Sequence, residues 1–220
     1  MKRVLVAELP ATAGQELDPV PSHHLEHVMR ASTGDGVLLY DGAGNEQPAV
    51  IVGLSPVRVD PAGEVRACPP PPPVHLVLSV LKHQPMDLAL RMATEAGAAA
   101  IHPVIMERTV AKGDRHDRWE RIVASAAEQC GRAHLPVLSP IRRLAESLDT
   151  LDVPLLFGAP GAERPEPASG GVGVVIGPAG GLSPREIQAL LARRARPIGL
   201  GPYVLRAETA VAAALALLTA

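Results

Sequence analysis

Residues 172–209 read VGVVIGPAGGLSPREIQALLARRARPIGLGPYVLRAET and decide how the C-terminal part of the chain folds. The first five residues, Val172–Ile176, are mostly β-branched and apolar, which is typical of a fully buried strand. Three glycines in the next loop, residues 177–181, allow positive φ angles and a close approach of a ligand to the backbone. Ser183, Pro184 and Glu186 then form a capping-box pattern, which predicts a helix that starts at Ser183.

The second half of the stretch repeats the arrangement of a strand followed by a loop. Pro197 is expected to end the helix, and residues 197–200 predict a short strand. A second Gly/Pro-rich segment, residues 201–209, leads into an apolar helix over residues 210–218. Two such loops therefore follow the C-terminal ends of two strands, where open α/β sheets bind their ligands. We expect the functional site at these loops.

The composition of the loops excludes several ligand classes. A P-loop ends in Gly-Lys-Ser/Thr, whereas Gly181 is followed by Leu182 and Ser183. The glycines that resemble a dinucleotide fingerprint lie before the strand, and neither loop holds a Ser/His/Asp or Cys/His set. A backbone-lined pocket with few charges remains, and it suits a flat, nearly neutral ligand that resembles adenosine.

Length and composition set wider bounds. The 220 residues fit one large or two smaller domains, and the chain shows neither a bilayer-spanning apolar run nor an N-terminal signal segment, so we expect a cytoplasmic protein without membrane contact. Cys68 and Cys130 lack the spacing of a zinc or redox motif, and the pair His23-His24 has no accompanying carboxylate or cysteine set, so no metal site is predicted.

Charge distribution bears on a nucleic-acid partner more than net charge does. The formal net charge is −2, but residues 107–143 hold eight Lys or Arg against five Asp or Glu. This stretch is the best electrostatic candidate for RNA, and an ordinary solvated face explains it equally well. Aromatic residues make up 2% of the chain, which argues against recognition of several stacked bases.

The chain changes character at a run of prolines. Residues 1–67 predict a small β-barrel with one helix at residues 22–31, capped by Ser22. Residues 68–73 include five consecutive prolines and predict a stiff linker. Residues 74–220 alternate strands and helices, which predicts an α/β domain with a parallel sheet and helices on both faces. The expected elements there are strands 75–81, 100–105, 137–138 and 154–157 and helices 86–96, 118–130 and 144–148.

Residues 176–183 with Glu186, together with residues 200–210, resemble the two C-terminal motifs of a SPOUT methyltransferase family, the bacterial 16S ribosomal RNA uridine-N3 methyltransferases. Weaker landmarks occur in the family's order along the whole chain, among them Lys82 and Arg108. The resemblance implies a trefoil knot in the C-terminal α/β domain, an N-terminal PUA-like β-barrel that positions RNA, bound S-adenosyl-L-methionine (SAM), and a homodimer acting on 16S ribosomal RNA of the small ribosomal subunit.

The resemblance also implies roles for individual residues. Arg206 would stabilise negative charge on the uracil carbonyls, and Glu208 would accept the N3 proton unless it instead pairs with Arg206 or caps the last helix. Expected RNA contacts are Arg30, Lys82, Arg108 and Arg132, of which Arg30 fits a surface salt bridge equally well. The expected SAM-binding residues are Phe157, Gly158, Ile176, Gly177, Pro178, Gly180, Gly181, Leu200, Gly201, Tyr203, Val204 and Leu205.

The sequence departs from the family pattern in several places. Ala179 replaces an acidic residue, Tyr203 an arginine and Ala207 a threonine, while residues 83–85 replace a Gly-Asp-Arg-like segment. The first two changes remove charges of opposite sign and affect substrate-binding detail more than SAM binding. A non-catalytic RNA-binding or ribosome-assembly protein with the same fold, and a methyltransferase for another RNA, stay open as alternatives. The almost wholly Ala, Val and Leu last helix is buried either inside the fold or against a second subunit.

Overall fold

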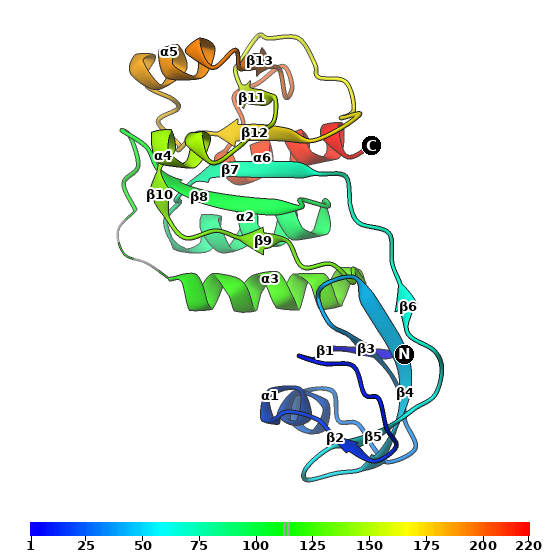
Figure 1. The fold of residues 1–220 in the computed structure, drawn as a ribbon. Coiled ribbons are helices and arrows are strands. Elements are labelled where there is room, and N and C mark those ends of the chain that lie inside the picture. The colour runs from blue at the N-terminus through cyan, green and yellow to red at the C-terminus, as the bar shows by residue number, and fades with distance from the viewer. Residues whose placement is uncertain (112, 114) are drawn as a thin grey trace. The chain divides into compact units, whose positions relative to one another are not determined.

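The computed structural model describes residues 1–111, 113 and 115–220, and the chain divides into two compact units (Figure 1). The first unit contains Met1–Pro70 and Ala127–Leu135, and the second contains Pro71–Ala126 and Pro136–Ala220. The proline run at residues 68–73 forms neither helix nor strand, and the change of unit falls within it.

The second unit is built on a parallel sheet, as the alternation of strands and helices predicts. In the described part of the chain the strand order is β10-β8-β7-β12-β11-β13, with β9 also paired to β8. Val174 of β12 lies opposite Leu76 of β7 and Leu156 of β11, so β12 has a neighbour on each side. The strands are β7 (Val74–Ser79), β8 (Ala100–Ile105), β9 (Val137–Leu138), β10 (Arg142–Arg143), β11 (Leu155–Gly158), β12 (Val172–Ile176) and β13 (Arg196–Ile198).

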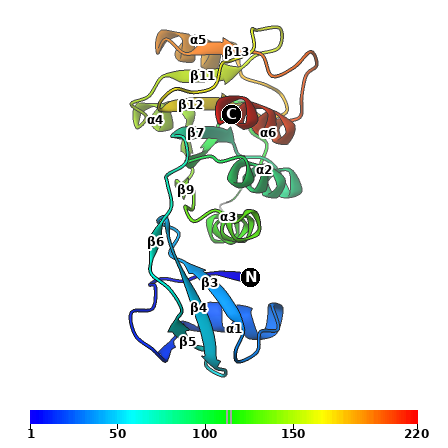
Figure 2. The ribbon, with the colours of Figure 1, turned by 90° about the vertical axis from the view of Figure 1, so that its right-hand side faces the viewer.

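Helices cover both faces of this sheet, which confirms the predicted layers (Figure 2). The helix α6 packs on α2, β12 and β7, whereas α4 and α5 bury Leu148 and Leu190 with Val77 and Val175 on the other face. The helices are α2 (His83–Glu95), α3 (His116–Cys130), α4 (Leu144–Asp149), α5 (Pro184–Ala192) and α6 (Ala207–Leu218). Within the described ranges, no helix is both long and apolar enough to span a membrane.

Local sequence rules explain where α5 begins, but they misplace its end. Ser183 and Glu186 form the predicted capping box: the Glu186 N–H donates to Ser183 Oγ at 3.1 Å, and the Ser183 N–H donates to Glu186 Oε2 at 2.7 Å. The prediction that Pro197 ends this helix is wrong, because α5 ends at Ala192 and Arg194 adopts a left-handed φ of +58°. Pro197 lies instead in β13, an edge strand, where the missing N–H is tolerated.

The first unit contains a six-stranded sheet with one helical segment. Its strands are β1 (Lys2–Leu5), β2 (Gln15–Glu16), β3 (Gly36–Tyr40), β4 (Asn45–Gly53), β5 (Arg58–Pro61) and β6 (Arg66–Ala67), in the order β1-β3-β4-β5-β2 with β6 beside β4. The helical segment starts earlier than predicted, as α1 (Pro19–His23) and the π-helix η1 (His24–Val28). Ser22 is therefore inside α1 rather than its N-cap, and its hydroxyl donates to the Leu17 carbonyl at 3.0 Å.

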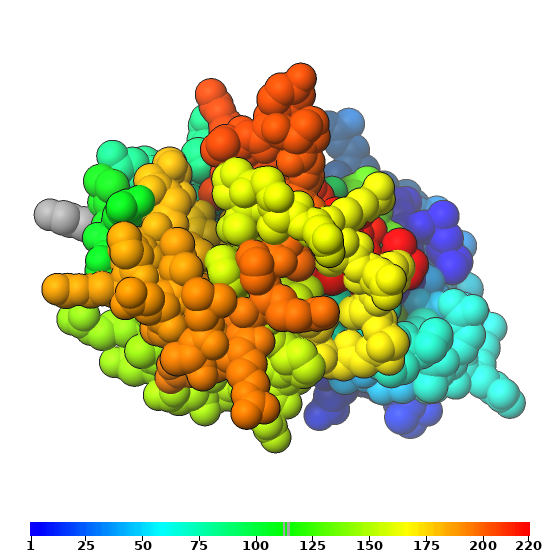
Figure 3. Space-filling model, turned by 90° about the horizontal axis from the view of Figure 1, so that it is seen from above, coloured from blue at the N-terminus to red at the C-terminus, as the bar shows by residue number. Residues whose placement is uncertain are grey.

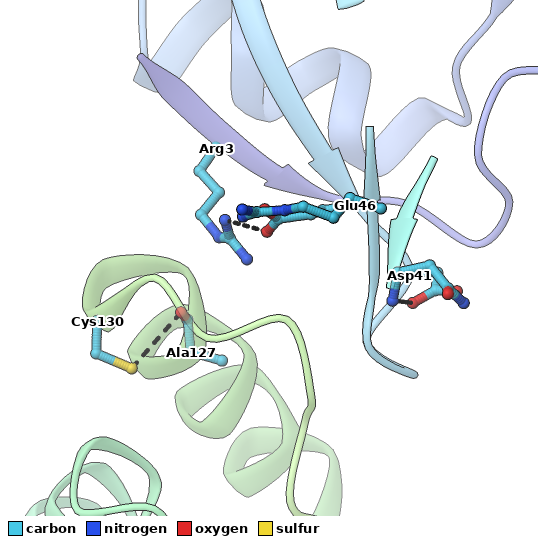
Figure 4. A network of polar contacts seen from close by, with 7 residues as sticks. Arg3, Asp41, Glu46, Ala127 and Cys130 are labelled. Carbon is cyan, nitrogen blue, oxygen red and sulfur yellow. Dashed lines mark hydrogen bonds and ion pairs between the residues drawn. The ribbon is translucent and has the colours of Figure 1, made fainter. Parts of the chain in front are cut away.

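A buried carboxylate ties three strands of the first unit together (Figure 4). Glu46 of β4 accepts from Arg3 of β1 at 2.9 Å and also pairs with Arg66 of β6. Burial by itself raises the pKa of Glu46, but the hydrogen bonds from Arg66 and Arg3 outweigh it and lower the pKa. The Arg3 guanidinium also lies 4.7 Å from the centre of the buried Tyr40 ring, so β1 is fixed to β3 and β4 by charge as well as by the ladder.

Candidate active site

A pocket of about 280 Å³ opens at the carboxyl ends of β11, β12 and β13. The strand order reverses at β12, because β7 and β8 lie on one side of it and β11 and β13 on the other. Ligands of open α/β sheets bind at such a point. The lining comes from the segments that leave the three strands, residues 158–160, 176–182, 200–201 and 203–205, and from Ala207 and Ala210 of α6. The side chains that line it are uncharged.

The loop after β12 depends on two of its glycines. A Cβ on Gly177 would stand 3.2 Å from the Leu182 nitrogen, so a larger residue would push the loop open. Gly181 has a φ of +71°, and its N–H donates to the Pro178 carbonyl at 2.8 Å, which closes a tight turn. The turn delivers the chain directly to the capping box of α5, so the loop is held at both ends.

Two residues that follow β8 hold the same loop from outside. The Glu107 N–H donates to Glu186 Oε1 at 2.8 Å, which gives that buried carboxylate a second backbone donor. Nη1 of Arg108 donates to the Gly180 carbonyl at 2.6 Å, and its stem lies 3.3 Å from where a Gly180 Cβ would be. Arg108, which the sequence assigns to RNA, thus supports the pocket wall in this structure.

The loop after β13 forms the other wall. A Cβ on Gly199 would lie 2.0 Å from the Ala162 carbonyl oxygen, and the Gly199 N–H donates to the Glu163 carbonyl at 2.7 Å. Only glycine fits this crossing of two chain segments. Beyond it, Tyr203 and Val204 are 81% and 82% exposed, and the red-orange segment that contains them projects from the surface in Figure 3. These two side chains form an open lip over the pocket.

The two predicted catalytic residues flank the pocket without lining it. Arg206 occupies the N-cap position of α6 with its side chain exposed, and Glu208 lies half-buried in the first turn of that helix. Ala207, between them, does line the pocket. The alternative that Glu208 pairs with Arg206 is not seen, because the described part of the chain contains no ion pair between them. Both groups are therefore available to a substrate that approaches over the lip.

The structure brings the predicted SAM-binding residues together with one exception. Phe157 is 4% exposed and packs in the core below the pocket. The remaining predicted residues, from Gly158 to Leu205, all belong to the lining. The sequence did not predict the lining residues that are small or apolar and carry no functional group: Ala159, Pro160, Ala179, Leu182, Ala207 and Ala210. The first two could have been found, because they directly follow Gly158.

The four predicted RNA contacts are divided between the two units. Arg30 and Arg132 belong to the first unit, and Lys82 and Arg108 to the second. Arg30 is exposed with a left-handed φ of +51°, whereas Arg132 is half-buried, and burial lowers the pKa of its guanidinium. Lys82 is exposed at the N-cap of α2, at the carboxyl end of β7.

Within the described ranges, no three His, Cys, Asp or Glu side chains are grouped so that they could hold a metal ion. The predicted histidine pair is used in other ways. His24 Nε2 lies 2.9 Å from Glu128 Oε1, and the His23 ring packs 4.6 Å from His27.

Comparison with known proteins identifies a family. A model described as an RNA methyltransferase domain matches residues 69–219. The chain is 34% identical to the ribosomal RNA small subunit methyltransferase E of Mycobacterium bovis, over 96% of this chain and 88% of the relative. It is 33% identical to the protein of the same name from Synechocystis sp., over 90% of this chain and 70% of the relative.

A solved structure extends the likeness to three dimensions. The ribosomal RNA small subunit methyltransferase E of Neisseria gonorrhoeae, bound to S-adenosyl methionine, is 30% identical with a TM-score of 0.87. The match covers 98% of this chain and 95% of that chain. Both units of the present chain therefore have counterparts in one protein of known structure.

Proposed function

Because this chain belongs to the RNA methyltransferase domain family, we propose that it is a SAM-dependent methyltransferase that methylates N3 of a uridine in 16S ribosomal RNA. The observation that carries the proposal is the pocket at the carboxyl ends of β11, β12 and β13, whose lining side chains are uncharged and whose loops contain glycines. A relative that covers nearly the whole chain is bound to S-adenosyl methionine. Relatives that match at 33% and 34% identity bear the name of small-subunit ribosomal RNA methyltransferases.

The residues of the pocket fit SAM. Backbone groups of residues 176–181 and 200–205 would hold the adenosine and methionine parts, and Gly158, which has no side chain, adds further backbone to the lining. Bound SAM supplies an electrophilic methyl group on a sulfonium. Because the lining has no carboxylate, backbone carbonyl dipoles and groups at the rim would meet the cofactor's charge.

Methylation at N3 requires the loss of the uracil N3 proton. Glu208 lies at the start of α6, next to the lining residue Ala207, and would accept that proton. Removal of the proton leaves negative charge on the two uracil carbonyl oxygens. The Arg206 guanidinium stays protonated at all relevant pH values and would stabilise this charge by hydrogen bonding.

The proposal includes the organisation of the molecule. Residues 1–67 would form the PUA-like β-barrel that positions RNA through Arg30, residues 68–73 the linker, and residues 74–220 the SPOUT domain. The crossing at Gly199, where Ala162 leaves space only for glycine, supports a trefoil knot of the segments that follow β11 and β13. The substrate also implies a place of action: the cytoplasm, where the small subunit matures.

A homodimer is the last part of the proposal. One face of α6 is buried in the fold, through residues such as Val211 and Leu215. The opposite face presents Ala212, Ala213 and Ala216, all of which are small and at least partly exposed. A surface of this kind allows close approach of a second helix, so we infer that α6 pairs with another copy of the chain.

The proposed reaction is tested by mass spectrometry of small-subunit ribosomal RNA from a strain that lacks the gene. Free 16S RNA and assembled subunits are incubated separately with the protein and SAM, and nucleosides are then quantified. We expect one new 3-methyluridine per RNA, in one of the two substrates or in both. Calorimetric SAM binding without any methylation would favour a different RNA, and the absence of both would favour a non-catalytic RNA-binding protein.

A further inference from the structure

Three arginines line a groove that is separate from the pocket described above. It has a volume of about 200 Å³ and lies between α2 and α3. Arg91 lines it from α2, and Arg118 and Arg121 line it from α3 together with Ile122 and Ser125. All of these residues lie in the second unit. We call this set the arginine groove.

The spacing of residues on α3 explains why they share one face. Positions 118, 121, 122 and 125 follow the i, i+3, i+4 and i+7 pattern, so their side chains line up along the side of α3 that faces α2. Ile122 is half-buried, whereas the three arginines and Ser125 are exposed. The groove thus has a partly apolar floor and walls made of guanidinium groups and a hydroxyl group.

Acidic residues neutralise the groove only in part. Asp87 of α2 accepts from Arg118 Nη2 at 2.5 Å and from Nε at 3.4 Å. Arg121 Nε donates to the Asp117 backbone carbonyl at 3.1 Å, which orients the guanidinium without neutralising it. Within the described ranges, neither Arg91 nor Arg121 forms an ion pair. Two positive charges of the groove therefore remain without an acidic partner.

The position of the groove relates it to the pocket. The helices α2 and α3 both start at the carboxyl edge of the sheet, because they follow β7 and β8. Lys82 stands at the start of α2 and Arg115 just before α3, both exposed. From that edge to Arg91 is nine residues of helix, roughly 13 Å. The elements that carry the arginine groove thus begin at the edge of the sheet where the pocket opens, as the positions of α2 and α3 in Figure 2 show.

We propose that the arginine groove binds the phosphodiester backbone of the RNA substrate, beside the nucleotide that enters the pocket. Guanidinium groups match a phosphate by paired hydrogen bonds, and the Ser125 hydroxyl adds a further donor. This inference rests on the proposed function, since it names a further contact surface for the same substrate.

The test removes the two arginines that are not neutralised. An Arg91→Gln/Arg121→Gln double variant leaves the Arg118–Asp87 pair in place. Its matched control, Arg164→Gln/Arg196→Gln, makes the same charge change at exposed arginines near the amino ends of β11 and β12. Small-subunit RNA affinity is measured by fluorescence anisotropy over a series of KCl concentrations. SAM affinity and thermal unfolding serve as checks of the fold.

We expect the groove variant to bind RNA roughly tenfold more weakly than wild type, with a salt-dependence slope lower by about 1.4 for two lost single-strand phosphate contacts. SAM affinity and the unfolding temperature should not change, and the control should match wild type. If the groove variant and the control have equal RNA affinity and equal salt-dependence slopes, the inference is overturned. An acidic protein would then be the better candidate for the partner of the arginine groove. If the wild-type protein neither binds nor methylates small-subunit RNA, the proposed function fails as well. If it does both and only the groove variant is unchanged, the arginine groove alone is excluded.

Discussion

Arg206 stands at the start of α6, exposed and next to the pocket but outside its lining. In the proposed reaction, replacement by Ala removes a donor to the charge that develops on the uracil, and such losses lower kcat by about 10²–10³-fold. We expect Arg206→Ala to show this loss while SAM affinity, measured by calorimetry, stays at the wild-type value. Arg206→Lys is the control for charge alone and should recover only part of the rate, because an ammonium lacks the planar pair of donors. Unchanged turnover in Arg206→Ala would remove this residue from the mechanism.

Arg108 is the residue for which the structure adds most to the sequence. Its hydrogen bond to the Gly180 carbonyl supports the loop after β12 from outside the pocket. Arg108→Ala should therefore weaken SAM binding by about fivefold, which corresponds to roughly 1 kcal/mol for one lost hydrogen bond. Calorimetry with SAM in the absence of RNA tests this role. If SAM affinity is unchanged and only RNA affinity falls, Arg108 is the RNA contact that the sequence suggests and not a support of the loop.

At the scale of single elements, α5 shows what local sequence can determine. Ser183, Pro184 and Glu186 define the start of the helix through contacts made within four residues, so their pattern is readable without the fold. The helix end depends on Arg194, a residue with no special propensity for the left-handed conformation that it adopts. The second backbone donor to the Glu186 carboxylate, the Glu107 N–H, comes from 79 residues away, and no local rule predicts it.

The capping box predicts losses of stability of two different sizes. Ser183→Ala removes one N-cap acceptor and should cost about 1 kcal/mol of unfolding free energy. Glu186→Ala removes a buried carboxylate that accepts from both Ser183 and Glu107, so we expect about 2–3 kcal/mol. Urea denaturation of both variants measures the difference. Equal losses would show that the bond to Glu107 contributes nothing to stability.

At the scale of the whole molecule, the sequence predicts the layers but not the closeness of distant segments. The parallel sheet, the two helical faces and the position of the pocket follow from alternating strands and helices and from two glycine-rich loops. The close approach of Gly199 to the Ala162 carbonyl and the meeting of Arg91 with Arg121 arise only when separate segments are packed together. The lining residues Ala207 and Ala210 were missed for the same reason, since an alanine acquires a role only through its position.

The exposed face of α6 gives the prediction for the assembled molecule. Leu215 is fully buried, so a charge there would unfold the chain and reveal nothing about subunits. Ala216 is exposed, so Ala216→Arg is compatible with the folded chain but places a charge where a second copy would pack. We expect wild type to sediment as a dimer and Ala216→Arg as a monomer with an unchanged unfolding transition at low concentration.

Leu191→Arg on α5 is the matched control, because Leu191 is 51% exposed and lies on a different helix. It should sediment as wild type does. A dimer that persists in Ala216→Arg would assign the subunit contact to another surface, and a wild-type monomer would refute the dimer altogether. A monomeric Ala216→Arg variant also reports on the site, since α6 begins at Arg206 and Glu208, the two groups proposed to act on the uracil. If the second copy steadies that end of the helix, the monomer should lose turnover while the isolated chain still binds SAM.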